Sequence, residues 1–415
     1  MNLMNRIFYS CLPTIFIIIA CFTGCKKSGS SPEEPVTGTA GPVALASLST
    51  TRVSAITTTS ATVEALVSGT GGGAVTSRGV CWAKTVNPTI SGNKAEAALV
   101  KGSGEFSTSI SGLEASSVYY VRSYATNAGG TNYGNELQFT TAAVTGAEFA
   151  LSPLFIAGST LASCDAEIKN DGGATITERG ICWATSAAPT VGSNRMAAGA
   201  GIGKFRVTIK NLAEKTTYYL RAYAVNASGI SYSEELSLKT IAKGNITYTF
   251  NKSAAPTAEE TAAYSRLQVA IDSAVWYLNN YTSAKRHVYL NYVPDVPTAD
   301  ANSEGWMRFG SNSSYQNLRT MLHELNHTIG NGTTSFWTNN LILNGVYQGV
   351  YANQVLRYIT ADAAAQIKGD TQHFWPYGLN QNSEVTSSWD YVYNCLIVEG
   401  MRRDGLTGGG IWSSN

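Results

Sequence analysis

The 415-residue chain has little of several residue types, and each shortage narrows its possible functions. Its 29 Lys and Arg balance 28 Asp and Glu, so we expect no basic surface for a nucleic acid. Its seven cysteines form no Cys-x-x-Cys pair, which excludes a zinc site of paired cysteines. No long apolar run follows residue 22, and there is neither a glycine-rich phosphate loop nor a nucleophile-elbow serine.

Histidine is scarcer still, yet two of the four histidines lie in one His-Glu-x-x-His motif, His323 to His327. Apolar residues recur around the motif with helical spacing, at Leu318, Leu322, Leu325 and Ile329. The pattern predicts a helix that ends at Gly330. Two imidazoles four residues apart share one helix face and can bind one zinc ion, beside which Glu324 can accept a proton from water.

The first residues are typical of an export signal. A basic start at residues 1–6 precedes an apolar run at 7–22, and Phe22-Thr23-Gly24-Cys25 follows. This stretch resembles a bacterial lipoprotein lipobox, which implies a signal peptide at 1–24, a lipid on Cys25 and a chain anchored in the bacterial cell envelope, at the outer membrane or cell surface. A plain secretory signal or an N-terminal membrane anchor is the alternative. The Ser-, Pro- and charge-rich residues 25–42 predict a flexible tether.

The middle of the chain repeats itself. Residues 78–83 (Arg-Gly-Val-Cys-Trp-Ala) match residues 179–184, and residues 119–125 match residues 218–224. Segments in which apolar and polar residues alternate, separated by turns with Gly and Asn, predict two all-β sandwiches, at 43–142 and 148–242. They resemble fibronectin type III and related immunoglobulin-like modules of bacterial surface proteins. The resemblance implies spacers, with glycan or protein binding as the alternative.

The repeated Cys-Trp pairs predict core positions of the two sandwiches. We expect Cys81 and Cys182 to be buried, with Trp82 and Trp183 packed as core residues. Cys164 has no counterpart in the first copy. It is either disulfide-bonded to Cys182 or a free buried thiol.

Residues 244–415 predict a domain with both helices and strands. A capping box at Thr257 opens a helix with Leu267, Ile271, Val275 and Leu278 on one face. A strand at 287–293, a loop at 294–304 and a strand at 306–310 precede the His-Glu-x-x-His helix. This order resembles the zincin metallopeptidases, which implies an α+β zincin-like catalytic domain with residues 306–309 at the upper edge of the cleft. His287 is expected to be a strand residue rather than a ligand.

The third zinc ligand must come from further along the chain. Residues 323–330 resemble the metzincin motif, but Thr333 stands where a third histidine is usual, and a threonine hydroxyl binds zinc poorly. His373 is the best candidate, because residues 373–380 set aromatic residues, Pro and Gly around it. That stretch also resembles one in uncharacterised secreted zincin-like domains. Glu384 is the alternative, as in gluzincins. His373 would otherwise cap a packed aromatic loop.

Together these resemblances imply a metal centre and a function. His323, His327 and His373 would hold Zn²⁺, Glu324 would be the general base, and Tyr377 would donate to the oxyanion or simply pack as an aromatic residue. Met401 would lie beneath the zinc or in the core.

We expect a membrane-anchored zinc metallopeptidase, a monomer acting on a protein or glycoprotein. One alternative is a surface-binding lipoprotein on an inactive zincin scaffold. The other is a zinc hydrolase for glycan-linked substrates.

Overall fold

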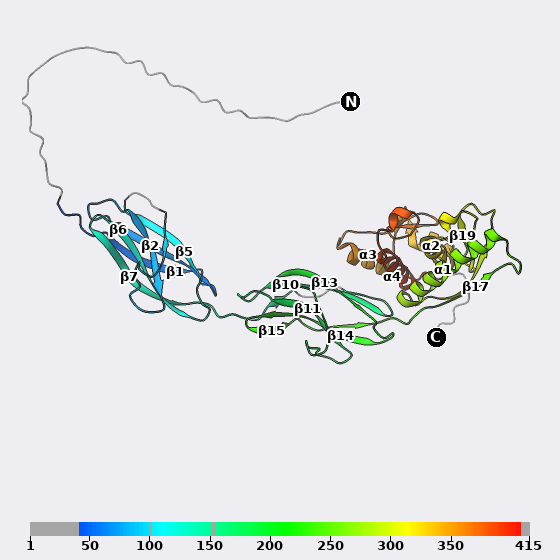
Figure 1. The fold of residues 1–415 in the computed structure, drawn as a ribbon, viewed down its shortest axis with the longest axis horizontal. Coiled ribbons are helices and arrows are strands. Elements are labelled where there is room, and N and C mark those ends of the chain that lie inside the picture. Colours follow the sequence, from blue (N-terminus) through cyan, green and yellow to red (C-terminus); the bar gives the residue numbers. More distant parts are fainter. Residues whose placement is uncertain (1–40, 99–101, 151–154, 408–415) are drawn as a thin grey trace, which may run out of the picture.

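The computed structural model describes residues 41–98, 102–150 and 155–407, which form two β-sandwiches followed by a domain of helices and strands (Figure 1). The predicted signal peptide, nearly all of the predicted tether and the predicted lipidation site Cys25 lie outside the described residues. Within these three ranges, no helix is both long and apolar enough to span a membrane.

The first sandwich packs a three-stranded sheet on a four-stranded one, all antiparallel. The strand orders are β1-β2-β5, from β1 (Ser47–Ser54), β2 (Ser60–Gly69) and β5 (Gly104–Ser111), and β4-β3-β6-β7, from β4 (Asn93–Glu96), β3 (Ser77–Ala83), β6 (Val118–Asn127) and β7 (Gly130–Thr140). Alternate residues of β2, such as Val63 and Val67, are buried, and those between them, such as Thr62 and Glu64, are partly exposed. This period-2 pattern is what the sequence predicts for a half-buried strand.

The second sandwich repeats this arrangement. One sheet is β13-β10-β8, with β9 also paired to β10, from β8 (Glu148–Phe149), β9 (Phe155–Ala157), β10 (Leu161–Asn170) and β13 (Gly203–Lys210). The other is β12-β11-β14-β15, with β16 also paired to β14, from β11 (Glu178–Ala184), β12 (Asn194–Ala197), β14 (Thr217–Asn226), β15 (Gly229–Tyr232) and β16 (Leu236–Lys239).

The predicted core positions of the repeat are confirmed. Cys81 and Cys182 are fully buried, and Trp82 and Trp183 pack against their cores while partly buried. Cys164 is a buried free thiol, so the disulfide alternative is wrong. Its strand β10 and the strand of Cys182, β11, belong to different sheets.

The C-terminal domain is built on the sheet β17-β18-β20-β19, from β17 (Asn245–Asn251), β18 (Lys285–Tyr292), β19 (Ala299–Ala301) and β20 (Trp306–Phe309). The first three strands are parallel and β19 is antiparallel. Helix α1 (Ala258–Tyr281) opens with the predicted capping box at Thr257. Helices α1 and α2 (Leu318–Ile329) share one apolar core with the sheet, which includes Leu267, Leu290 and Phe309.

The prediction that residues 306–309 form the edge strand is wrong. Residues 306–309 form β20 inside the sheet, and the edge is β19, from the segment 294–304 that was predicted to be a loop. A turn reverses the chain here, because the Asn302 side chain accepts hydrogen bonds from the backbone N–H of Glu304 and Trp306, and Gly305 has φ +98°. The sequence hides β19 because three residues, Ala-Asp-Ala, have low strand propensity.

The remaining elements carry the loops around the His-Glu-x-x-His helix. A small sheet, β21-β22-β23-β24, comes from β21 (Ile342–Leu343), β22 (Val346–Tyr347), β23 (Lys368–Gly369) and β24 (Phe374–Trp375). The other helical segments are α3 (Val350–Thr360), α4 (Trp389–Arg403), the 3₁₀ turns Ser313–Tyr315 and Asn382–Glu384, and a π-helical turn Trp337–Leu341.

The second sandwich is docked against the C-terminal domain. A shared apolar cluster joins them, formed by Ile156, Leu161, Tyr358, Val392 and Leu396. Arg206 Nη2 donates to the Tyr358 carbonyl at 2.7 Å, and the Ser159 and Thr160 hydroxyls donate to the Asn280 carbonyl. This module therefore covers apolar surface of the C-terminal domain, beyond any role as a spacer.

Candidate metal centre

Helix α2 forms as the sequence predicts. The Asn317 side chain caps its N-terminus by accepting from the Thr320 N–H, and Gly330, with φ +116°, ends it in the left-handed region. Leu322 and Leu325 on its inner face are fully buried. The capped helix thereby holds His323 and His327 together, one turn apart.

The structure brings His323, His327 and His373 together. One ring nitrogen of each lies within 4.8 Å of the others, and the Nε2 atoms of His323 and His327 are 3.1 Å apart. The His373 ring centroid is 5.4 Å from that of His323 and 5.8 Å from that of His327.

The Nδ1 atom of each histidine has a different partner. His323 Nδ1 lies 2.9 Å from the Gly378 carbonyl, and His327 Nδ1 lies 2.7 Å from the Asn331 carbonyl. His373 Nδ1 lies 3.4 Å from the Asp370 carboxylate. An imidazole that donates from Nδ1 presents Nε2 as an acceptor, the form that binds a metal. The donor set therefore fits a zinc ion held by three histidines with one open position.

Burial keeps the first two histidines neutral. Burial and, to a smaller extent, the neighbouring His327 lower the pKa of His323 to about 3, against the opposing effect of the hydrogen bond to Gly378. Burial likewise lowers the pKa of His327. Because only neutral imidazole binds a metal ion, these environments favour occupancy.

Glu324 is a buried carboxyl with an unpartnered oxygen. Its side chain is on α2 beside His323, the residue is 4% exposed, and Oε2 has no hydrogen-bond partner among the residues that the structure describes. Burial and, to a smaller extent, Asp300 raise its pKa to about 8, against the opposing effect of Arg319. A buried carboxyl oxygen without a partner, on the helix that carries two of the three histidines, fits a group that exchanges a proton with a bound water.

Two glycines allow the His373 loop to pack against α2 and the turn that follows it. A Cβ on Gly332, which has φ +67°, would lie 2.0 Å from the Gln372 carbonyl oxygen. A Cβ on Gly378 would lie 1.9 Å from the Phe374 carbonyl oxygen. A side chain at Gly332 would displace the loop that carries His373. A side chain at Gly378 would disturb the contact between the Gly378 carbonyl and His323.

Glu384, the alternative third ligand, lies outside the histidine cluster. Its carboxylate accepts hydrogen bonds from the backbone N–H of Leu379 and Asn380, at 2.9 and 3.1 Å. Arg319 of α2 donates to the Leu379 carbonyl at 2.6 Å. These contacts hold residues 373–380, the ligand loop, in place. Glu384 therefore positions the loop that carries His373.

The contacts of Tyr377 are those of a packing residue. Its ring lies edge-on to Tyr393 of α4, with centroids 5.5 Å apart, and its carbonyl accepts from the Asn394 side chain at 2.7 Å. Burial raises the pKa of its phenol. These contacts agree with the packing role, and the oxyanion role of Tyr377 stays a prediction.

The other candidates also lie outside the cluster. The Thr333 hydroxyl donates to the His327 carbonyl at 2.6 Å, and His287 lies on β18 between the hydroxyls of Thr247 and Thr249. Met401 is fully buried, and its sulfur accepts from the Asn331 side chain at 3.3 Å. Met401 is therefore a core residue that contacts the partner of His327.

Sequence reasoning missed the residues that orient the histidines. Asp370 had a readable signal, since its carboxylate accepts from the backbone N–H of Gln372 and His373, the local turn that an Asp often makes. Asn331 and Gly378 act through their carbonyl oxygens, which any residue carries, so their types gave no signal.

No protein-family model matches the chain, and no curated protein sequence matches it. Among solved structures, it is similar to the FN1–FN3 domains of chicken CNTN1 at 13% identity, with a TM-score of 0.21, over 48% of this chain and 69% of that one. The two β-sandwiches described above rest on their own strand pairing.

Proposed function

We propose that the chain is a zinc metallopeptidase that hydrolyses peptide bonds in proteins or glycoproteins. The supporting observation is the convergence of His323, His327 and His373, together with the unpartnered carboxyl oxygen of Glu324 on the helix that carries the first two. We further propose that it acts as a monomer, anchored to the bacterial cell envelope by a lipid on Cys25.

The proposed mechanism divides the chemistry between metal and chain. Zinc held by the three Nε2 atoms would polarise the substrate carbonyl and lower the pKa of a bound water towards about 7. Glu324 accepts the proton of the attacking water at Oε2 and delivers it to the leaving amine.

The open edge of the main sheet supports a peptide substrate. Strand β19 pairs with β20 on one side only, and its Asp300 raises the pKa of Glu324. An extended peptide can add to such an edge through main-chain hydrogen bonds. A substrate there would lie alongside the strand nearest the general base.

The first test is metal content and hydrolysis of the chain from Lys26 onward. We expect one zinc per wild-type chain, loss of zinc in His373→Ala, and retained zinc in Glu324→Gln with hydrolysis of a denatured protein lowered by about 10²–10⁴-fold. His287→Ala is the matched control for His373→Ala, because His287 lies on β18 outside the cluster, and it should keep its zinc.

Three results would overturn parts of this proposal. No zinc in wild type, even after zinc is supplied, would leave the inactive-scaffold alternative. Zinc that persists in His373→Ala would remove His373 from the ligand set. Zinc binding with hydrolysis only of glycan-linked esters or amides would favour the third alternative.

A further inference from the structure

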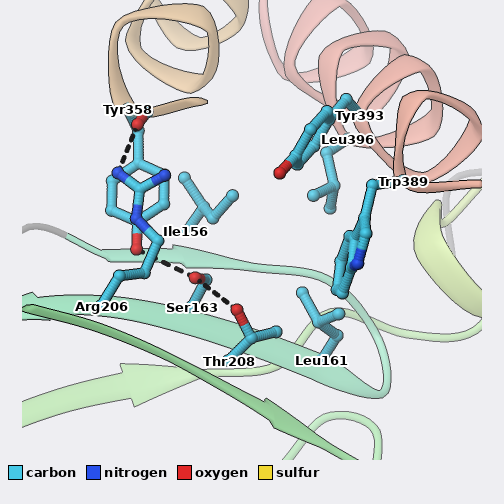
Figure 2. A pocket seen from close by; sticks show the side chains of 9 residues that line it. All are labelled: Ile156, Leu161, Ser163, Arg206, Thr208, Tyr358, Trp389, Tyr393 and Leu396. Carbon is cyan, nitrogen blue, oxygen red and sulfur yellow. Dashed lines mark hydrogen bonds between the residues drawn. The ribbon is translucent and has the colours of Figure 1, made fainter. Parts of the chain in front are cut away.

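A cavity lies where the second sandwich meets the C-terminal domain. Its volume is about 230 Å³, and Figure 2 shows its lining: Ile156, Leu161, Ser163, Arg206, Thr208, Tyr358, Trp389, Tyr393 and Leu396. We propose that this pocket binds one neutral sugar residue of a glycan. The inference does not rest on the proposed peptidase function, since none of these residues belongs to the histidine cluster.

The pocket is lined by side chains from one face of a sheet and one face of a helix. Ser163 of β10 is paired with Thr208 of β13, and their side chains form the floor on the sheet face that points away from the sandwich core (Figure 2). Trp389, Tyr393 and Leu396 follow one another at helical spacing on α4 and form the opposite wall. Both sides of the site thus come from regular elements.

The size and walls suit a single ring. Drug-sized ligands occupy pockets of roughly 300–1,000 Å³, so this smaller cavity fits a single sugar ring. Aromatic and aliphatic side chains form its walls, and hydroxyls line its floor. A pyranose ring likewise combines apolar and polar surfaces, with C–H groups on its faces and hydroxyls around its rim.

Polar atoms with spare capacity line the space. The Ser163 hydroxyl already contacts the Tyr358 hydroxyl at 3.0 Å and the Thr208 hydroxyl at 2.9 Å, which leaves Thr208 at the end of a hydroxyl chain. Neither Tyr393 Oη nor Arg206 Nη1 has a hydrogen-bond partner in the described part of the chain. Figure 2 shows the Tyr393 hydroxyl pointing into the space between α4 and the sheet.

The charge balance favours a neutral ligand. Arg206 is paired with Asp165 through two hydrogen bonds, at 2.6 and 2.8 Å, so its positive charge is already compensated. Its guanidinium also lies 4.1 Å from the Tyr358 ring centroid, which fixes its plane. Arg206 Nη1 can therefore donate to a sugar hydroxyl without selecting for an acidic group.

The pocket also touches the ligand loop. Tyr393 lies 5.9 Å from Trp389 on one side and 5.5 Å from Tyr377 on the other, between ring centroids. A sugar in the pocket would therefore lie one aromatic contact away from the loop that carries His373.

The test is direct binding of methyl glycosides of neutral hexoses and N-acetylhexosamines to the chain from Lys26 onward, by saturation-transfer NMR and calorimetry. We expect at least one to bind, and Thr208→Val and Tyr393→Phe each to weaken it by about tenfold, because each removes one hydrogen bond. Ser109→Ala is the matched control, since Ser109 pairs with Thr62 in the first sandwich as Thr208 pairs with Ser163. Binding should be unchanged in Ser109→Ala and in Glu324→Gln.

The proposal fails if no glycoside binds to wild type at tens of millimolar, a result that does not depend on how any variant folds. It also fails if folded Thr208→Val and Tyr393→Phe bind as wild type does, or if methyl glycosides of uronic acids bind and the neutral glycosides do not. Loss of binding in Glu324→Gln would place the sugar at the metal centre instead.

Discussion

At the scale of single residues, the histidines of the candidate site depend on partners that hold their rings. Each Nδ1 contacts an oxygen: Gly378 for His323, Asn331 for His327 and Asp370 for His373. Two of these oxygens belong to the backbone. Asp370 is the one side chain of the three, so it is the partner that a substitution can remove cleanly.

Asp370→Asn should weaken zinc binding by about 10- to 100-fold, the usual cost of losing a carboxylate that orients a metal-binding histidine. Competition with a chelator of known affinity measures the change. Asp362→Asn is a control, because Asp362 also caps a local turn but lies outside the cluster. Equal zinc affinity in both variants would contradict the role of Asp370.

Gly332→Ala should also weaken zinc binding, by about tenfold or more, because its Cβ would collide with the Gln372 carbonyl and displace His373. Gly345→Ala is the matched control. Gly345 has a similar positive φ of +77°, but the nearest atom to its Cβ would be 3.9 Å away. If the two variants lose zinc equally, backbone strain rather than the clash is the cause.

The sequence predicted the three clustered histidines, but not what holds them. His323 and His327 follow from helix periodicity, and His373 from the aromatic residues, Pro and Gly around it at residues 373–380. Glu384 stayed open as the alternative ligand, because sequence shows a carboxylate downstream without showing which N–H groups it contacts.

At the scale of elements, the ends of α2 were readable and the short strand β19 was not. Asn317 and Gly330 are standard cap residues with a local physical effect. Strand β19 forms only because a turn at Asn302 folds it back onto β20. Its identity depends on a partner strand, which a three-residue pattern cannot reveal.

Gly330→Ala should destabilise the fold by about 1 kcal/mol or more, because Ala at φ +116° is strained. Thermal unfolding of the apo chain measures this. Gly192→Ala serves as control, since Gly192 has no positive φ and its Cβ would meet its nearest neighbour at an ordinary 3.5 Å. An unchanged Tm in Gly330→Ala would show that the helix end relaxes freely.

At the scale of the whole molecule, the two sandwiches share a fold and differ in their outer faces. In the first, the outward positions of the three-stranded sheet are small and polar, such as Ser60, Ser107 and Ser109. The matching positions of the second are Leu161, Arg206 and Thr208, which meet the C-terminal domain. Comparing the outward faces of the two copies would have predicted this docking from sequence.

A chain that starts at Gly244 should therefore unfold at a lower temperature than one that starts at Glu148. Without the second sandwich, the apolar side chains of Tyr358, Val392 and Leu396 lose their cover, and each contributes about 1.5–3 kcal/mol when buried. We expect the Tm to fall by more than about 5 °C. The chain from Lys26 onward is the control, because it differs from the Glu148 chain only by the first sandwich and should unfold at the same Tm as that chain. Equal Tm values for all three chains would contradict the docking.

Helix α4 contacts both the second sandwich and the loop that carries His373. Tyr393 and Leu396 line the pocket at the second sandwich, while Asn394, between them in sequence, holds the carbonyl of Tyr377 in the ligand loop. Substitutions at these neighbouring positions are therefore expected to be non-additive. In evolutionary terms, the second sandwich cannot be exchanged for another copy of the repeat unless one face of α4 changes with it.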